Sequence, residues 1–358
     1  MGPSEIQSFC SRLPKVELHA HLNGSFSEKT LYSLYMDSPG CKTEDIRYLI
    51  SSFHQGSDRT LDDCFKNFDI AHAVTISPAA VRRGTMDVIS EFASDGVIYL
   101  ELRTTPRTVP GVMSKKQYIQ AVVDAIRDVP NFIGPERFII VKLLLSVNRR
   151  DERSEAEANI KEAVEAHMAY PDIVVGVDLS GDPKCGTVAE NILPLFADAR
   201  SKGLKVALHC AEVPNEKEVE AIIRFKADRI GHGTCIHPQY GGSEKLWTLL
   251  LESKVPIEVC LTSNIKCKTV ENYESHHLQH LLPVHHPIAI STDDKGVFCT
   301  TLSKEFEIAA ETFLLSFGDL CRFTEMAIDA SFASPDEKNQ LLEKLNNFKV
   351  LEGIHCVE

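Results

Sequence analysis

The feature that most constrains the fold is a series of eight short apolar runs, most of them rich in β-branched residues. Each run ends in polar residues. The runs are 16–22, 97–105, 138–147, 173–180, 205–212, 229–233, 256–262 and 287–293. Stretches with helical periodicity separate them, and near-continuous apolar character is typical of parallel strands buried on both faces. Because eight strand–helix units are what a (β/α)8 barrel requires, the sequence predicts an α/β fold, a single TIM barrel.

The connection between the first and second runs is far longer than the others. It extends from about residue 24 to 95 and contains three helical patterns, which we expect to form a helical insertion over the mouth of the barrel. Residues 303–358 should add closing helices. A doubly wound sheet is disfavoured because no G-x-G-x-x-G follows any run. Since no Pro/Gly/Ser-rich linker or internal repeat divides the chain, we expect one domain over residues 1–358.

Charge and composition restrict the partners. The chain has 38 Lys and Arg against 51 Asp and Glu, a net charge of −13, which disfavours nucleic acid and anionic membranes as partners. The longest apolar run, 138–147, contains Lys142 and Ser146, so we expect no membrane span, and the first residues do not resemble a secretory signal. Eleven cysteines without a C-x-x-C pair are typical of reduced thiols. We expect a cytoplasmic (cytosolic) monomer that binds a small molecule.

Histidine and aspartate residues stand at the predicted carboxyl ends of several strands, where barrel enzymes carry their catalytic groups. His19 and His21 are two residues apart, which places both side chains on one face of a strand. An isolated H-x-H pair is a weak signal. With His209 and Asp293 from other strand ends, however, the set has three imidazoles and one carboxylate, which suits Zn²⁺ with a water completing the site. We predict one zinc ion per chain.

Three further residues at these ends are candidates for the chemistry. Glu212 follows His209 closely enough to carry a proton at the same mouth, although a loop or helix-start carboxylate is the structural alternative. His232 lies between two glycines, which allow close approach, and can orient or deprotonate a metal-activated water. Asp293 and Asp294 are neighbours whose side chains should diverge, one toward metal and one toward substrate.

Five other histidines precede the eighth run. Because they fall in a loop, we expect them to face solvent. They are His276, His277, His280, His285 and His286.

Four motifs at these positions resemble the adenosine and AMP deaminase family. They are Val16-Glu-Leu-His-Ala-His-Leu22, His209-Cys-Ala-Glu212, Gly231-His-Gly233 and Ser291-Thr-Asp-Asp294, in the family's order. The resemblance covers about residues 13–333 and implies a zinc-dependent hydrolytic deaminase. By motif, the zinc ligands would be His19, His21, His209 and Asp293. Glu212 would protonate purine N1 and His232 would partner the attacking hydroxide. Asp294 would hold N7, and the Gly181 N–H would meet N3.

One departure from the family members that act on free nucleosides indicates the substrate. Those have H-L-D-G, whereas this chain has His21-Leu-Asn23-Gly24. A neutral amide can donate to a 5′-phosphate that a carboxylate would repel, so we predict a purine nucleoside monophosphate. The resemblance implies hydrolysis of N6-methyl-AMP, or other N6-substituted AMPs, to IMP and an amine. The predicted substrate-binding residues are His21, Asn23, His72, Thr104, Thr105, Pro106, Arg107, Asn148, Gly181 and Asp294.

The roles of two basic residues near this set remain open. Lys295 could add a phosphate donor, and Arg103 could do the same or form a structural ion pair with Glu101 or Asp95.

Other functions also remain open. An ordinary adenosine deaminase would use the same zinc site on a free nucleoside, and a non-catalytic scaffold would keep zinc for folding. A two-metal amidohydrolase would need a Lys at the end of the fourth strand, where this chain has Asp178-Leu-Ser-Gly181-Asp182. A cytidine-deaminase type of site is excluded because its H-x-E and P-C-x-x-C signature is absent.

Overall fold

A computed structural model describes residues 2–37, 61–185 and 191–354. Its eight strands form one parallel sheet in the order β1 to β8. The strands are β1 (Lys15–His21), β2 (Val97–Thr104), β3 (Ile140–Asn148), β4 (Val174–Ser180), β5 (Lys205–Cys210), β6 (Arg229–His232), β7 (Ile257–Val259) and β8 (Ile288–Ile290). A parallel bridge between Ala20 and Asp293 joins the last strand to the first, so the sheet is a nearly closed barrel. The predicted (β/α)8 fold is confirmed.

All eight predicted strands are present, but the last two are shorter than predicted. The seventh run was expected over 256–262, whereas β7 ends at Val259 and a helix begins at Leu261. Cys260 and Leu261, which follow β7, are also buried. Periodicity alone cannot show whether a short run of buried residues belongs to a strand or to a helix.

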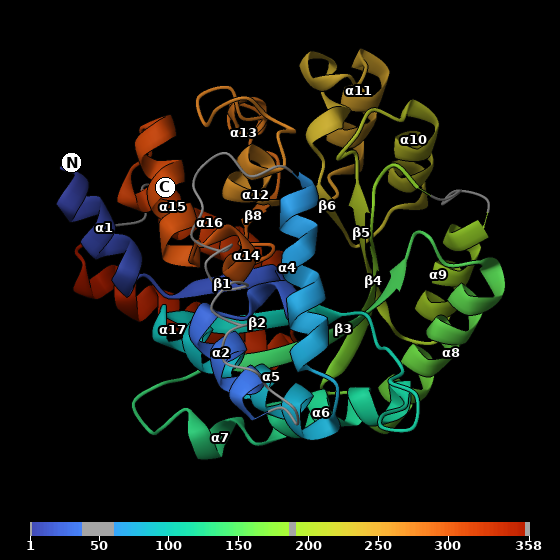
Figure 1. Cartoon of the computed structure of the whole chain (residues 1–358). Helices are drawn as coiled ribbons and strands as arrows, with labels where there is room; N and C mark the ends of the chain where they lie inside the picture. The colour runs from blue at the N-terminus through green and yellow to red at the C-terminus, as the bar shows by residue number, and fades with distance from the viewer. Residues whose placement is uncertain (1, 38–60, 186–190, 355–358) are drawn as a thin grey trace.

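Helices surround the strands (Figure 1). Those before β3 are α1 (Pro3–Arg12), α2 (Glu28–Met36), α4 (Leu61–Val74), α5 (Pro78–Ser94), α6 (Lys115–Arg127) and α7 (Val129–Phe132), with the 3-10 turn η1 (Asn23–Ser25). Those between β3 and β8 are α8 (Arg153–Ala169), α9 (Leu193–Ser201), α10 (Glu216–Phe225), α11 (Glu244–Ser253), α12 (Leu261–Lys266) and α13 (Leu278–Leu281), with η3 (Thr234–Ile236) and η4 (Pro238–Tyr240). Those after β8 are α14 (Lys295–Phe298), α15 (Leu302–Phe313), α16 (Phe317–Ala330) and α17 (Pro335–Leu351). Serine side chains cap several of them; Ser77 and Ser114, for example, accept a hydrogen bond from the first turn of α5 and α6.

The helices between β1 and β2 cover one end of the barrel. Helix α4 contacts η1, which follows β1, and α14, which follows β8, so it lies over the carboxyl ends of these strands (Figure 1). The Arg107 side chain, just beyond β2, donates to the backbone carbonyls of His72 and Thr75 at the end of α4. These bonds tie α4 to the barrel mouth. Part of the predicted insertion, 38–60, lies outside the described residues.

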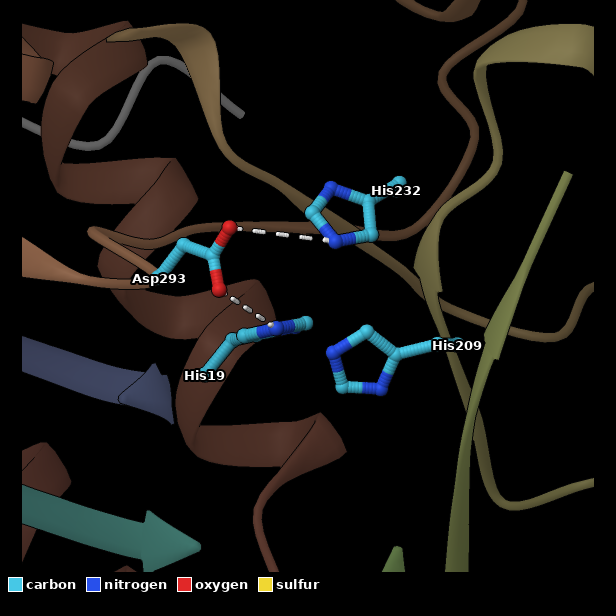
Figure 2. A group of neighbouring side chains, drawn as sticks. All are labelled: His19, His209, His232 and Asp293. Carbon is cyan, nitrogen blue, oxygen red and sulfur yellow. Dashed lines mark ion pairs between the residues drawn. The ribbon is translucent and has the colours of Figure 1, made fainter. Parts of the chain in front are cut away.

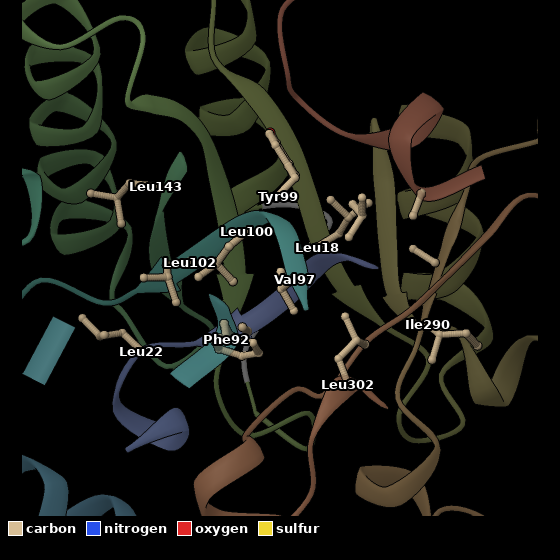
Figure 3. Packing of buried hydrophobic residues seen from close by; sticks show 14 of the residues in the cluster. Leu18, Leu22, Phe92, Val97, Tyr99, Leu100, Leu102, Leu143, Ile290 and Leu302 are labelled. Atoms are coloured by element: carbon tan, nitrogen blue, oxygen red, sulfur yellow. The ribbon is translucent and has the colours of Figure 1, made fainter. Parts of the chain in front are cut away.

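Apolar side chains fill the space between the strands and the helices. Leu18 and Leu22 from β1 and its end, Leu102 from β2 and Ile290 from β8 belong to one buried cluster with the helix residue Phe92 (Figure 3). Burying such side chains contributes roughly 1.5–3 kcal/mol each relative to exposure. This packing holds the strand ends, and therefore the side chains they carry, in fixed positions.

The interior of the barrel carries charged side chains that pair with one another. Arg103 Nη1 lies 3.0 Å from Asp178 Oδ1, and Arg103 Nη2 lies 2.9 Å from Glu258 Oε2. Arg229 in turn pairs with Glu258 and Glu101. All of these side chains are fully buried, where an unpaired charge would be strongly unfavourable.

The structure decides between the two alternatives for Arg103 and corrects the expectation for the loop histidines. Arg103 forms the structural ion pair, and its partners are Asp178 and Glu258 rather than Glu101 or Asp95. Three of the five loop histidines are buried: they are His276, His277 and His286. His276 and His286 are bonded inside the protein, to Asn264 and to the Val255 carbonyl.

Across the described part of the chain, no helix combines the length and the apolarity that crossing a membrane requires.

Candidate active site

Five side chains of predicted function converge at the carboxyl ends of β1, β5, β6 and β8. The buried side chains of His19, His209, His232 and Asp293 each offer a ligand atom, and these atoms lie within 4.8 Å of one another. Figure 2 shows the three imidazoles and the carboxylate turned toward a common centre. His21 joins them, because its Nε2 lies 3.0 Å from His209 Nε2. Among the described residues, this is the group that could hold a metal ion.

The distances within the group distinguish the ligand candidates. A tetrahedral ion with bonds of about 2.0–2.2 Å has its ligand atoms ~3.3–3.6 Å apart. Asp293 Oδ1 lies 3.3 Å from His19 Nε2 and 3.4 Å from His21 Nε2, close to this spacing. His232 Nε2 instead lies 3.9 Å from the other carboxylate oxygen. The group of ligand atoms within 4.8 Å of one another includes His232 and not His21, so the set of His19, His21, His209 and Asp293 stays a prediction.

Two buried carboxylates orient two of these imidazoles. His19 Nδ1 lies 2.7 Å from Glu258 Oε2, and His209 Nδ1 lies 3.0 Å from Asp178 Oδ1. A proton on each Nδ1 leaves the Nε2 lone pair free for a metal. Burial alone would raise the pKa of Asp178, but the charges of His209 and Arg103 hold this pKa below its usual value. His19 Nε2 has no hydrogen-bond partner within the described structure, as expected of a nitrogen that awaits a metal.

The backbone at the strand ends is bent so that these side chains point inward. His232 and Asp293 have φ of 63° and 61°, in the left-handed region that residues other than glycine rarely adopt. Such strain concentrates at functional sites, where the surrounding structure maintains it. Gly231 lies so close to His19 that an added Cβ would be 2.8 Å from the imidazole Cε1. A glycine is therefore required beside His232 for reasons of space.

Two further carboxyl groups border the metal-ligand candidates. Glu212 Oε2 lies 3.7 Å from His232 Nε2, while its Oε1 is buried with no hydrogen-bond partner among residues 2–37, 61–185 and 191–354. The same holds for Asp294 Oδ1. Burial, together with the negative charges of Asp293 and Glu212, raises the pKa of Asp294 well above its usual value. Unpartnered buried oxygens are costly, so both carboxyl groups are ready to bond a ligand.

His232 is held as a neutral base. Burial lowers the pKa of His232 to about 4. Asn264 Nδ2 lies 3.5 Å from the Nδ1 of His232, and the side-chain oxygen Oδ1 of Asn264 lies 3.0 Å from His276 Nε2. The sequence prediction missed His276. Another missed contact is Ser263 Oγ, which donates to Asp293 Oδ2 over 2.7 Å.

Two close backbone contacts involve predicted substrate-binding positions. Gly24, next to Asn23, packs so tightly on Asp294 that an added Cβ would be 1.7 Å from Asp294 Oδ1. The Cα of Gly181 faces Asn148, and an added Cβ there would be 2.4 Å from the amide oxygen. The first contact joins the end of β1 to the residues after β8, and the second joins the ends of β3 and β4.

The remaining predicted positions are arranged differently. Thr104 ends β2 and its hydroxyl is 2.7 Å from the phenol oxygen of Tyr118. Thr105 is half-buried and Pro106 is buried beyond it. The side chain of His72 is exposed at the end of α4, and its backbone carbonyl accepts a hydrogen bond from Arg107. Lys295 forms an ion pair with Glu91, so its ammonium group is already engaged and the suggestion that it binds phosphate loses support.

The comparison with known proteins decides the family. The sequence profile described as adenosine deaminase matches residues 14–348. The chain belongs to the adenosine deaminase family. As a member of it, the protein is a hydrolytic deaminase, and the resemblance predicted from the four motifs is confirmed.

Relatives extend over nearly the whole chain. The N6-methyl-AMP deaminase of Bos taurus is 41% identical over 344 residues, which are 96% of each protein. That of Homo sapiens is 41% identical over 343 residues, 95% of each. Among solved structures, the apo N6-methyl-AMP deaminase from Arabidopsis thaliana is 37% identical with a TM-score of 0.84, over 95% of this chain and 98% of that one. An Arabidopsis structure in complex with GMP has a TM-score of 0.85 and 37% identity, over 96% and 98%.

Proposed function

We propose that this deaminase hydrolyses N6-methyl-AMP to IMP and methylamine with one Zn²⁺ per chain. The observation that carries the proposal is Asn23, a neutral side chain next to the Gly24 that packs on Asp294, at the position where a carboxylate would repel a 5′-phosphate. Relatives 41% identical over 95–96% of the chain are named N6-methyl-AMP deaminase, which supports the same substrate. The Arabidopsis structures in complex with IMP and GMP support a nucleoside monophosphate as the ligand.

Zinc fits the residues present. Three imidazoles and one carboxylate form a nitrogen-and-oxygen set that suits this ion, and the unpartnered His19 Nε2 gives it a lone pair. The ligands would be His19, His21, His209 and Asp293. Bound there, zinc supplies Lewis-acid chemistry that activates water at neutral pH.

The protein's own groups then move the protons. His232 is neutral and lies beside Glu212, so it can accept a proton from the attacking water. Glu212, whose Oε1 is buried without a partner in the described chain, can deliver a proton to purine N1 as water adds at C6. The C6–N6 bond then breaks, methylamine leaves with a proton, and C6 becomes the carbonyl of IMP. Asp294 Oδ1 is free to share a proton with N7, and the Gly181 N–H can donate to N3.

The test is a steady-state comparison of the zinc-loaded protein on N6-methyl-AMP, AMP, N6-methyladenosine and adenosine, followed by ultraviolet absorbance and amine release. We expect kcat/KM to be highest for N6-methyl-AMP. A preference for adenosine would refute the assignment of Asn23 while leaving the deaminase chemistry intact. Turnover of none of the four would instead favour a zinc-stabilised scaffold.

A single substitution tests the phosphate argument. Asn23→Asp places a negative charge beside the 5′ position, so KM for N6-methyl-AMP should rise at least tenfold, which corresponds to ~1.4 kcal/mol. KM for N6-methyladenosine should stay the same or fall.

A cytosolic monomer that binds a free nucleotide, and neither nucleic acid nor a membrane, also remains a prediction.

A further inference from the structure

A buried tyrosine next to the predicted substrate-binding residues has no part in the chemistry proposed above. Tyr118 lies in the first turns of α6 and is completely buried. Its phenol oxygen is 2.7 Å from Thr104 Oγ1, the hydroxyl at the end of β2. The side chain of Asn23, beyond the end of β1, also lies close enough to interact with the phenol group. The hydroxyl group therefore lies between two strand ends that both carry predicted substrate-binding residues.

The direction of these bonds follows from the donors available. Asn23 Oδ1 has no hydrogen-bond partner within the described chain, so the Asn23 amide N–H is the group that can interact with the phenol oxygen. The single phenol proton is then available for Thr104 Oγ1. Thr104 keeps its own hydroxyl proton, and Asn23 keeps its second amide proton. Both are left to donate to a ligand.

We propose that Tyr118 is a positioning residue that makes the site selective for a 5′-phosphate, by holding Asn23 and Thr104 as hydrogen-bond donors toward it. The inference rests on the proposed function, because it assigns the phosphate to the side of the site where Asn23 lies. Arg107, on the β2–α6 connection, lies near Tyr118 and adds positive charge to this side. Charge-assisted hydrogen bonds to phosphate are about twice as strong as neutral ones.

The alternative is that Tyr118 only fills space, since its ring belongs to the main buried cluster. The positioning role requires the hydroxyl group of Tyr118, whereas the space-filling role requires only its ring. Tyr118→Phe keeps the ring and removes the bond to Thr104 and the interaction with Asn23. A matched control is Tyr99→Phe, because Tyr99 is equally buried near the start of β2 and its hydroxyl donates to Glu101 over 2.8 Å, away from the carboxyl end of the strand.

The experiment measures kcat and KM of the zinc-loaded wild type, Tyr118→Phe and Tyr99→Phe on N6-methyl-AMP and N6-methyladenosine. We expect Tyr118→Phe to lower kcat/KM for the monophosphate about tenfold, mainly through KM, since one well-placed hydrogen bond contributes ~1.4 kcal/mol. The loss for the nucleoside should be at least fivefold smaller. Tyr99→Phe should leave the ratio of the two kcat/KM values as in the wild type.

Two outcomes would overturn the inference: an equal loss on both substrates, which indicates a structural role, or a wild-type ratio in Tyr118→Phe. If that variant does not fold, Thr104→Val removes the partner hydroxyl and should show the same selective rise in KM; a wild-type ratio there overturns the inference as well. Failure of the proposed function would look different, because the wild type itself would then show no preference for the monophosphate.

Discussion

Asp178 offers a test of whether the negative charge of a carboxylate that orients a predicted metal ligand contributes to metal affinity. Its Oδ1 accepts hydrogen bonds from His209 Nδ1 and Arg103 Nη1, each over 3.0 Å, and its Oδ2 accepts from Ser146 Oγ over 2.7 Å. Asp178→Asn is close to isosteric. The asparagine carbonyl can keep the bonds from His209 and Arg103, and its amide can donate to Ser146, whose hydroxyl is also an acceptor. The substitution therefore removes the charge and keeps the shape.

The expected magnitude follows from these contacts. Replacing a carboxylate that orients a ligating histidine typically costs 10- to 100-fold in metal affinity, which is about 1.4–2.7 kcal/mol. The loss of folding stability should be smaller than the ~3–5 kcal/mol of a broken buried pair, because Arg103 keeps Glu258 as a partner. Zinc affinity should thus fall more clearly than the stability of the metal-free protein.

The assay is competition for zinc against a chelator of known affinity, together with urea unfolding of the metal-free protein. Asp182→Asn is the matched control, since Asp182 follows the same strand but pairs with the exposed Arg150. Its zinc affinity should equal that of the wild type. Wild-type zinc affinity in Asp178→Asn would refute the reasoning, even if that variant unfolded more easily.

Three further predictions concern other parts of the chain. Glu212→Gln should bind zinc normally yet lower kcat by ~10²–10⁴, and a wild-type kcat would remove Glu212 from the chemistry. Gly24→Ala should abolish turnover without unfolding the barrel, because the new methyl would overlap Asp294; full activity together with a wild-type circular dichroism spectrum would contradict this. Burial lowers the pKa of Lys15 to about 8 from its ordinary value of 10.5, so the unfolded chain binds one more proton than the folded chain between these pH values, and stability should rise with pH there. The rise should be on the order of 3 kcal/mol and absent in Lys15→Met, as urea unfolding at both ends of the window would test.

The sequence predicted the positions of the strands because each buried strand is a local pattern, an apolar run with polar residues at its end. It also placed His19, His21, His209 and Asp293 together, since parallel strands in a barrel bring their carboxyl ends to one mouth. These local patterns were therefore sufficient to predict the (β/α)8 barrel and the place of the candidate site in it.

Contacts between residues far apart in sequence could not be predicted in the same way. Arg103 finds its partners 75 and 155 positions away, at Asp178 and Glu258. The charged residues inside apolar runs were the signal that could have identified this network, because a charge within a buried strand needs a partner. His276 was assigned to solvent from its loop context, whereas its bond to Asn264 of α12 depends on how the loop folds back.

The bridge between Ala20 and Asp293, where the barrel closes, lies among the predicted metal ligands. The backbone N–H of Asp293 donates to the His19 carbonyl over 2.8 Å, and that of His21 donates to the Asp293 carbonyl over 3.0 Å. His19 and His21 lie on β1, whereas Asp293 follows β8 and is synthesised only after all eight strands. A nascent chain therefore cannot bring the predicted metal ligands together until its last strand has docked against its first. Closure of the barrel and completion of this ligand set are one folding event.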